Sequence, residues 1–136
     1  MKKVKKNIFI TGGLGQDGKI LTYLLNQDKY NIFIFAKRKT ENNVKNCKIF
    51  YENLRNKKKI SSHFKKNKPD IVLHVAANNP SFKEKSYNLF YKENLLTTKS
   101  VFDETFKANK KAKFIFFNSS QIFKKKNGKV NENSKF

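Results

Sequence analysis

The sequence of 136 residues has a single cysteine, Cys47, and only two histidines. A lone thiol cannot close an internal disulfide, so the chain is not a disulfide-stabilised scaffold. One cysteine and two distant histidines also give no cluster with the spacing of metal ligands. We expect Cys47 to be a half-buried strand residue without chemistry, and His63, in a lysine-rich segment, to be solvated.

Long apolar runs are also missing. The basic start, residues 1–6, is followed by an apolar stretch that Gly12 interrupts. Such a stretch is far too short for the apolar core of a signal peptide or for a membrane span. Because the single cysteine points to a reducing compartment, we expect a cytoplasmic protein without a membrane partner.

Acidic residues are scarce, 10 against 31 lysines and arginines, which gives a net charge of +21. A charge of this size attracts phosphates, so a basic nucleic-acid-binding protein is one interpretation. However, only Arg38 and Arg55 offer the forked donor that reads base edges, and the lysines are spread in short groups along the whole chain. The 18 asparagines and the many Ile and Phe residues indicate a codon bias toward A and T. We therefore interpret the lysines as solvated faces and expect no specific nucleic-acid partner.

What the sequence does contain is a glycine-rich turn between a strand pattern and an amphipathic helix pattern. Gly13, Gly15 and Gly18 fit G-x-G-x-x-G, and Gly12, Gly15 and Gly18 fit G-x-x-G-x-x-G. Such a turn presents backbone N–H groups and the positive end of a helix to a pyrophosphate. We expect Gly12 or Gly13 to turn the chain, Gly15 to allow close approach of the phosphates, and Gly18 to let the helix pack on the sheet. The alternative is an ordinary tight turn, but the flanking strand and helix favour dinucleotide binding.

Apolar strand patterns alternate with helical patterns along the chain, which is typical of a parallel sheet joined by crossover helices. We predict strands at residues 6–10, 31–36, 48–51, 71–76 and 113–117, and helices at residues 16–27, 57–66 and 82–109. Right-handed crossovers then give one doubly wound, Rossmann-like α/β/α domain over residues 1–136, with strand order 3-2-1-4-5. In the first helix we expect one inward apolar face, made of Ile20, Leu21, Leu24 and Leu25.

Four segments in this order resemble the motifs of one family: Thr-Gly-Gly-Leu-Gly-Gln-Asp-Gly at 11–18, Pro-Asp-Ile-Val-Leu-His-Val-Ala-Ala at 69–77, Asn-Leu-Leu-Thr-Thr at 94–98, and Phe-Ile-Phe-Phe-Asn-Ser-Ser-Gln-Ile-Phe at 114–123. That family is the extended short-chain dehydrogenase/reductases, the NAD(P)-dependent epimerases, dehydratases and reductases of nucleotide sugars. The variant Gly-Gln-Asp-Gly is most similar to GDP-mannose 4,6-dehydratase. The resemblance implies an NAD(P)-binding domain that serves a nucleotide-sugar substrate, and a structural role at the sheet for His74. A homodimer is left open, because the sheet edge after the last strand would favour pairing with another chain.

The resemblance also assigns site residues. Around the cofactor it places Gly12, Gly13, Leu14, Gly15, Gln16, Asp17, Gly18, Asn53, Leu54, Ala76 and Ala77. It implies that Asn53 and Leu54 lie beside the adenine, where the family usually has Asp-Leu, and that the two alanines pass under the cofactor. It puts Asn94 near the active site in a supporting role, and Ser119 at the position that hydrogen-bonds the reacting sugar. Without the family context, Asn94 reads as a helix-surface amide and Ser119 as a strand-end cap.

The form of the cofactor is predicted from a missing acid. Strands that select NAD end in Asp or Glu about 20 residues after the glycines, because a carboxylate accepts from the ribose 2′-OH. Here the second strand is followed by Lys37 and Arg38. A basic pair would instead bind the 2′-phosphate of NADP, so the sequence favours NADP over NAD.

The family's acid/base, a Tyr in Tyr-x-x-x-Lys, does not follow Ser119, and Phe123 occupies the position four residues later, where the family usually has Tyr. We therefore expect the amino-terminal part of an enzyme, which binds NADP weakly and turns over nothing. Gln121 replaces the Glu of dehydratases, and an amide cannot take up a proton near neutral pH, so dehydration is disfavoured. A non-catalytic Rossmann module that senses the cofactor or scaffolds a partner remains the alternative.

Overall fold

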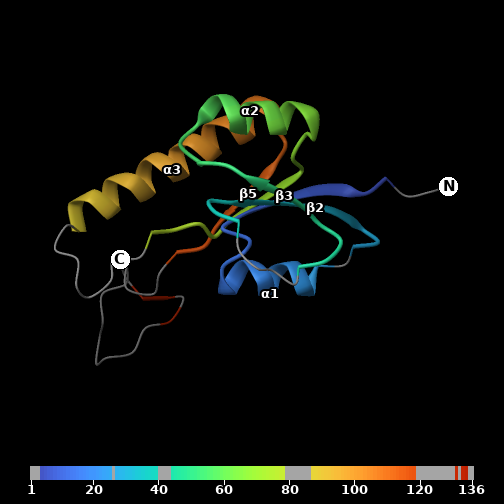
Figure 1. Ribbon diagram of the computed structural model, residues 1–136, viewed down its shortest axis with the longest axis horizontal. Coiled ribbons are helices and arrows are strands. Elements are labelled where there is room, and N and C mark those ends of the chain that lie inside the picture. The colour runs from blue at the N-terminus through green and yellow to red at the C-terminus, as the bar shows by residue number, and fades with distance from the viewer. Residues whose placement is uncertain are drawn as a thin grey trace.

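The computed structural model describes residues 4–25, 27–39, 44–78, 87–118, 131 and 133–134. Its elements are β1 (Lys6–Thr11), α1 (Gln16–Leu24), β2 (Tyr30–Ala36), β3 (Lys48–Tyr51), α2 (Lys57–Lys66), β4 (Ile71–His74), α3 (Tyr87–Ala108) and β5 (Lys113–Phe116). The five strands are parallel in the order β3-β2-β1-β4-β5. Helices α2 and α3 cover one face and α1 the other (Figure 1). The predicted Rossmann-like sheet and its three layers are confirmed.

Phenylalanine and isoleucine alternate along β1 and β2, and the pleat sends them to opposite faces of the sheet. Phe9, Phe33 and Phe35 face α2 and α3. There Phe9 stacks on Phe33 with ring centroids 4.6 Å apart and meets the ring of Phe64 edge-on at 4.8 Å. The isoleucines of the same strands form the core beneath α1, and they are Ile8, Ile10, Ile32 and Ile34. A strand that reads as uniformly apolar therefore builds an aromatic core on one side and an aliphatic core on the other.

The predicted inward face of α1 is right for Leu21 and Leu25, which pack against the core, and wrong for Ile20 and Leu24. Ile20 and Leu24 are 50% and 70% exposed. The side turned to the sheet instead carries two buried and two half-buried residues, Gly18, Leu21, Thr22 and Leu25. The physical reason is Gly18, which packs against the turn at Gly12 and Gly13 and so fixes the rotation of the helix about its axis.

Two predicted boundaries also differ from the observed ones by more than one residue. Helix α1 ends at Leu24, because Leu25 is already extended, with ψ 127°. Strand β4 ends at His74, two residues early, since the Ala76 N–H donates to the Thr11 side chain rather than to a neighbouring strand. The third helix is described from Tyr87 on, and the predicted first turn at 82–86 lies outside the described residues.

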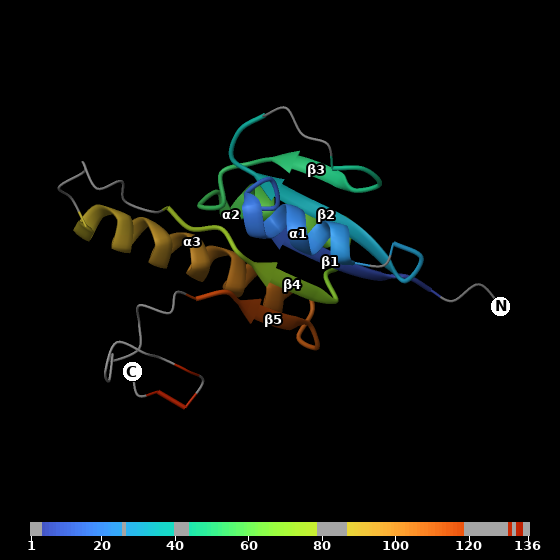
Figure 2. The same cartoon turned by 90° about the horizontal axis from the view of Figure 1, so that it is seen from below.

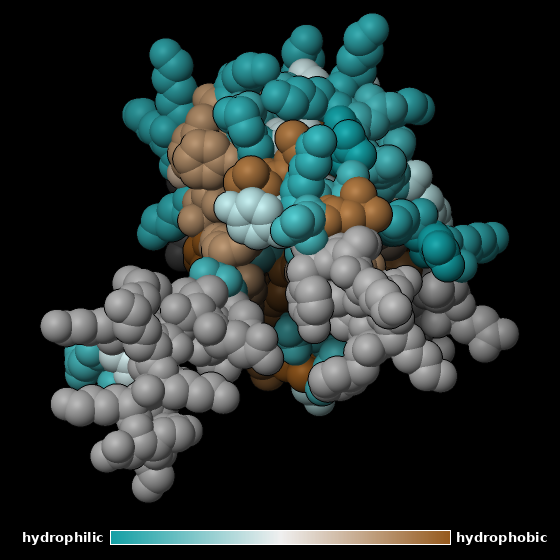
Figure 3. Space-filling view, turned by 90° about the vertical axis from the view of Figure 1, so that its left-hand side faces the viewer, coloured by the Kyte–Doolittle hydropathy of each residue, from teal (hydrophilic) through white to brown (hydrophobic). Residues whose placement is uncertain are grey.

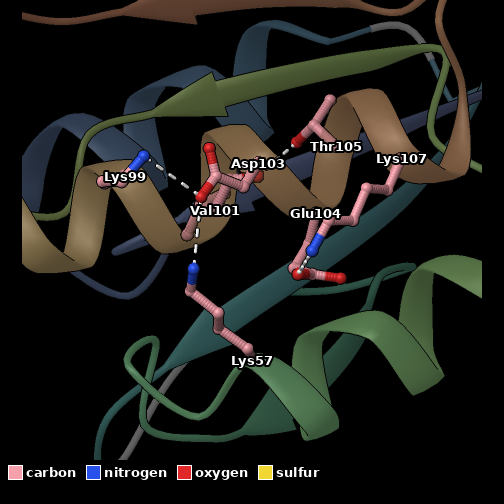
Figure 4. A network of polar contacts seen from close by, with 7 residues as sticks. All are labelled: Lys57, Lys99, Val101, Asp103, Glu104, Thr105 and Lys107. Atoms are coloured by element: carbon pink, nitrogen blue, oxygen red, sulfur yellow. Dashed lines mark hydrogen bonds and ion pairs between the residues drawn. The ribbon is translucent and has the colours of Figure 1, made fainter.

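One ion pair links α3 to the lysine-rich helix α2 on the aromatic side of the sheet, and two more lie within α3 (Figure 4). Asp103 of α3 accepts from Lys57 of α2, with Nζ and Oδ2 3.2 Å apart, and it also pairs with Lys99 at 3.4 Å. The hydrogen bond from Lys57, followed by the nearby charge of Lys99, holds the pKa of the Asp103 carboxyl below its usual value. Glu104, nearly buried, pairs with Lys107 at 2.8 Å. Two of the chain's few acids thus lie where lysines would otherwise repel one another.

The first turns of α3 extend past the carboxyl ends of the strands (Figures 1 and 2). Leu89, Tyr91 and Leu95 in these turns are more than half exposed. Viewed from that end, apolar atoms form a strip between hydrophilic side chains (Figure 3). Within the described ranges, no helix is both long and apolar enough to cross a membrane.

We expect Phe64→Ala to lower the free energy of unfolding by about 3–5 kcal/mol, because the fully buried ring leaves a cavity between α2 and the aromatic core. Urea denaturation followed by circular dichroism measures this loss. Phe102→Ala is the control, since Phe102 is 47% exposed and its removal should cost about 1 kcal/mol. Equal losses in the two variants would contradict this account of the core.

Candidate functional site: a cleft at the carboxyl ends of the strands

A cleft of about 700 Å³ opens where β1, β2, β3 and β4 end. Most residues predicted to surround a cofactor line it: Gly12, Leu14, Gly15, Gln16, Asp17, Gly18, Lys37, Arg38, Asn53, Leu54, Ala76, Ala77 and the supporting Asn94. Gly13 is the exception, because it is buried beneath the turn. Ser119 and Gln121, the other predicted catalytic positions, lie outside the described residues.

Gly12 makes the sharp turn off β1. Its φ is +68°, in the left-handed region that favours glycine, and a Cβ there would lie 2.9 Å from Ala76 Cα. The backbone after β1 and the backbone after β4 therefore touch. Gly13 serves packing instead, because a Cβ on it would lie 2.6 Å from a side-chain carbon of Ile34 in β2.

Gly18 and Gly15 have different tasks in the same motif. A Cβ on Gly18 would lie 2.4 Å from Gly13 Cα, so only glycine lets α1 approach the turn this closely. A Cβ on Gly15 would meet only the Gly12 carbonyl oxygen, at 3.2 Å, and would otherwise point into open space. Gly15 is also the N-cap of α1 and has no side chain to cap it, so the first N–H groups of the helix are presented to the cleft. Bare N–H groups at a helix N-terminus suit an anion.

On the β2 side, Lys37 and Arg38 lie exposed at the rim of the cleft. Sequence reasoning missed Glu52, an acid directly after β3 that also lines the cleft. Its carboxylate is engaged by α2, since Oε1 lies 3.2 Å from His63 Nε2 and 3.8 Å from Lys59 Nζ. The rule that ligand-binding residues follow the carboxyl ends of parallel strands would have found Glu52.

The expectation that His63 is solvated is wrong. Its side chain is only 21% exposed, and its ring lies 3.9 Å from that of Phe50, centroid to centroid. His63 adjoins Phe64 on the inward side of α2, while the lysines of that helix take the outward side. Spacing along the helix, rather than local composition, decides its environment.

Asn53 begins a tight turn after β3. Its side-chain oxygen accepts from the Arg55 N–H at 3.0 Å, and its backbone carbonyl accepts from the Asn56 N–H at 2.8 Å. Asn56 then caps α2 by accepting from the Lys59 N–H. These bonds fix the loop that holds Leu54 at the cleft wall.

A buried chain of side-chain hydrogen bonds lies beneath the cleft. His74 Nδ1 is 2.8 Å from Thr11 Oγ1, and His74 Nε2 is 3.0 Å from Thr98 Oγ1. Thr11 Oγ1 also accepts from the Ala76 N–H, so the same hydroxyl joins the His74 ring to the backbone that follows β4. The chain ties β1, β4 and α3 together, in agreement with a structural role for His74. Burial lowers the pKa of His74 to about 4, so the ring is neutral near pH 7.

Asn94 in α3 is bound to the loop that follows β4. Asn78 N–H donates to Asn94 Oδ1 at 2.8 Å, and Asn94 Nδ2 donates to the Asn78 carbonyl at 3.0 Å. The neighbouring Glu93 pairs with Arg55 at 2.6 Å. Asn78 and Glu93 line the cleft, and sequence reasoning missed both.

Neither metal binding nor thiolate chemistry has support here. Among the residues that the structure describes, no group of three or more His, Cys, Asp or Glu is placed to hold a metal ion. Cys47 is half-buried just before β3, and burial raises the pKa of its thiol. The polar groups that line the cleft are backbone N–H groups, amides, the basic pair Lys37 and Arg38, and the carboxylates of Asp17, Glu52 and Glu93.

The family model for the NAD dependent epimerase/dehydratase family matches residues 8–136, nearly the whole chain. The chain belongs to this family. The resemblance to NAD(P)-dependent epimerases and dehydratases seen in the sequence is thus confirmed. No match was found among curated protein sequences.

Solved structures of this family share the fold. UDP-glucose 4-epimerase from Stenotrophomonas maltophila, with bound NAD and formylated UDP-arabinopyranose, superposes with a TM-score of 0.80 at 15% identity, over 96% of this chain and 42% of that one. The Bifidobacterium longum enzyme in complex with NAD+ and UDP gives 0.74 at 20% identity, over 86% and 38%. Bordetella bronchiseptica WbmG in complex with NAD gives 0.70 at 19%, also over 86% and 38%. The chain therefore spans about two fifths of the length of these proteins.

We expect stability to fall as the pH drops through the range in which His74 must take up a proton. A histidine has a pKa near 6.5 when unfolded, and about 4 here, so its stabilising contribution is complete above about pH 6.5 and declines as the pH falls toward 4. Between about pH 7 and about pH 5 the free energy of unfolding should decrease by about 2 kcal/mol. Urea titrations at the two pH values measure it. His74→Gln should flatten this dependence, and a variant that keeps the full decrease between the two pH values would contradict the assignment to His74.

Proposed function

We propose that this chain binds a pyridine dinucleotide in the cleft, with the diphosphate on the glycine turn and on the N-terminus of α1. The observation that carries the proposal is the uncapped α1 terminus at Gly15, facing a cleft from which side chains are absent at Gly12 and Gly15. Backbone N–H groups and the helix dipole together favour a diphosphate at this point.

The adenosine half would lie over β2 and β3, beside Asn53 and Leu54. An amide at Asn53 already accepts from Arg55 N–H, so its NH₂ group is the part best placed to donate to a ring nitrogen. The nicotinamide half would then lie over Ala76 and Ala77, whose small side chains allow close approach. Gly13 would contribute through packing rather than contact.

We propose NADP as the preferred form. Lys37 and Arg38 are exposed at the end of β2, where a 2′-phosphate would lie. The nearby acid, Glu52, is turned to α2, with Oε1 3.2 Å from His63 Nε2 and 3.8 Å from Lys59 Nζ. A basic pair with no competing free carboxylate favours a phosphate over a hydroxyl.

For the longer protein to which such a domain corresponds, we propose nucleotide-sugar chemistry. The support is family membership and the neighbours crystallised with UDP or a UDP-sugar. Ser119 stays the residue proposed to contact the reacting sugar, and Gln121 in place of Glu favours epimerase or keto-reductase chemistry over dehydration. A cytoplasmic location stays a prediction from the sequence.

Titration of the chain with NADPH and with NADH tests cofactor binding and preference together. With no tryptophan in the chain, the emission of the reduced nicotinamide is read without tryptophan background. We expect both to bind and NADPH to bind more tightly. Arg38→Gln should raise the Kd for NADPH by roughly tenfold or more and change that for NADH by less than about twofold, as for the loss of one charged hydrogen bond.

Lys39→Gln is the matched control, because Lys39 is exposed on the same segment but does not line the cleft. This variant should leave the Kd for NADPH and the Kd for NADH within about twofold of their wild-type values. Equal affinities for NADPH and NADH would reject the NADP preference while keeping the site. Failure of both nucleotides to bind would reject the site itself.

A further inference from the structure

Glu52 lies where β2 and β3 end side by side at the cleft. Its N–H donates to the Ala36 carbonyl at 2.9 Å, so Glu52 directly adjoins the last residue of β2. Lys37 and Arg38 follow Ala36 in the chain, and all four residues line the cleft. A carboxylate therefore lies on the same wall as the basic pair proposed to hold a 2′-phosphate. Free in the cleft, that carboxylate would oppose a phosphate, because like charges repel more strongly where solvent is partly excluded.

The carboxylate of Glu52 is engaged by two side chains of α2. His63 Nε2 donates to Oε1 at 3.2 Å, and this nitrogen carries the hydrogen because a carboxylate has acceptors only. Lys59 Nζ lies farther away, at 3.8 Å, and its side chain is 60% exposed. An exposed ion pair of that kind holds a side chain weakly. His63 is therefore the contact that decides where the carboxylate points.

His63 is itself held in place by aromatic packing. Its ring centroid lies 3.9 Å from that of Phe50, and 5.6 Å from that of Phe35 in an edge-on arrangement. The next residue, Phe64, is fully buried in the same core and fixes the inward side of α2. Because rings on two sides restrict the imidazole, Nε2 is a hydrogen-bond donor in a fixed position beside Glu52.

We propose that Glu52 and His63 set the preference of the cleft between NADP and NAD. His63 is a positioning residue, since it holds the Glu52 carboxylate toward α2 and so leaves Lys37 and Arg38 free to bind a 2′-phosphate. The inference rests on the proposed function, because it places the 2′ position of the adenosine ribose at that basic pair. A carboxylate released from His63 would repel the 2′-phosphate of NADP and accept from the 2′-hydroxyl of NAD. Loss of His63 should therefore shift the preference toward NAD.

The test measures the Kd for NADPH and the Kd for NADH in the complete chain, by the emission of the reduced nicotinamide. His63→Leu keeps an apolar side chain against Phe50 and removes the donor. This variant should lower the preference for NADPH, taken as the ratio of the two Kd values, by roughly fivefold or more, as for the loss of one hydrogen bond to a charged group. His63→Gln keeps an N–H donor and should hold the ratio within about twofold of wild type. Lys58→Gln is the matched control on the same helix, because Lys58 is exposed and does not line the cleft, and it should leave the ratio unchanged.

Replacing Glu52 distinguishes a specific effect from a packing defect. In the His63→Leu background, Glu52→Gln should restore the preference for NADPH to the wild-type ratio or above, because no carboxylate remains to repel the phosphate. A ratio that stays low in the double variant would overturn the proposal, and so would Kd values that rise equally for the two nucleotides in His63→Leu. A Glu52→Gln variant that binds NADH at least about fivefold more weakly than wild type would also overturn it, since Glu52 would then already contact the ribose.

The same titrations separate this inference from the proposed function. A wild-type chain that prefers NADPH, with an unchanged ratio in His63→Leu, rejects the role of Glu52 and His63 alone. A wild-type chain that binds both nucleotides equally rejects the NADP preference and this inference with it. A wild-type chain that binds neither nucleotide rejects the cofactor site itself, together with everything inferred about its preference.

Discussion

The contact between Gly18 and the Gly12–Gly13 turn is the constraint on which the rest of this structure depends. A Cβ on Gly18 would lie 2.4 Å from Gly13 Cα and 2.6 Å from the Gly12 oxygen, so no other residue permits this approach without displacement. The contact fixes the rotation of α1, which decides which of its residues meet the isoleucines of the sheet. It also aims the uncapped N-terminus of α1 at the cleft. Packing and ligand geometry thus follow from one close approach of backbone to backbone.

A second layer of organisation is supplied by polar side chains. Where β1 and β4 end, the backbone is held by Thr11, His74 and Asn94 rather than by strand pairing. Each of these bonds is buried or partly buried, so an unmade bond would leave a desolvated polar group. Such groups fix a loop in one conformation more sharply than apolar contacts, which tolerate sliding. These bonds tie the cleft wall to the sheet beneath it.

A net charge of +21 suggests a uniformly basic surface, but the few acidic residues are placed beside basic ones. The acids among the described residues are few, yet Asp103 and Glu104 pair with lysines of α2 and α3. At the cleft, Glu52 pairs with Lys59 and Glu93 pairs with Arg55. These exposed and half-exposed pairs contribute little stability individually. Their positions leave Lys37 and Arg38 as the basic groups at the rim of the cleft. The overall excess of lysine says less about function than the few places where charges of opposite sign meet.

The sequence by itself determined the order of the elements, the parallel sheet and the glycine turn. Apolar residues recur every second residue in half-buried strands and every three to four residues in helices, so their spacing indicates the element directly. It could not determine the buried face of α1 or the burial of His63, since both depend on which neighbour a helix meets. Glu93 and Asn78 were also missed, because each lies one residue outside the segments 94–98 and 69–77 from which site residues were predicted. Only the tertiary structure brought α3 against the loops after β3 and β4, through close packing that no local pattern encodes.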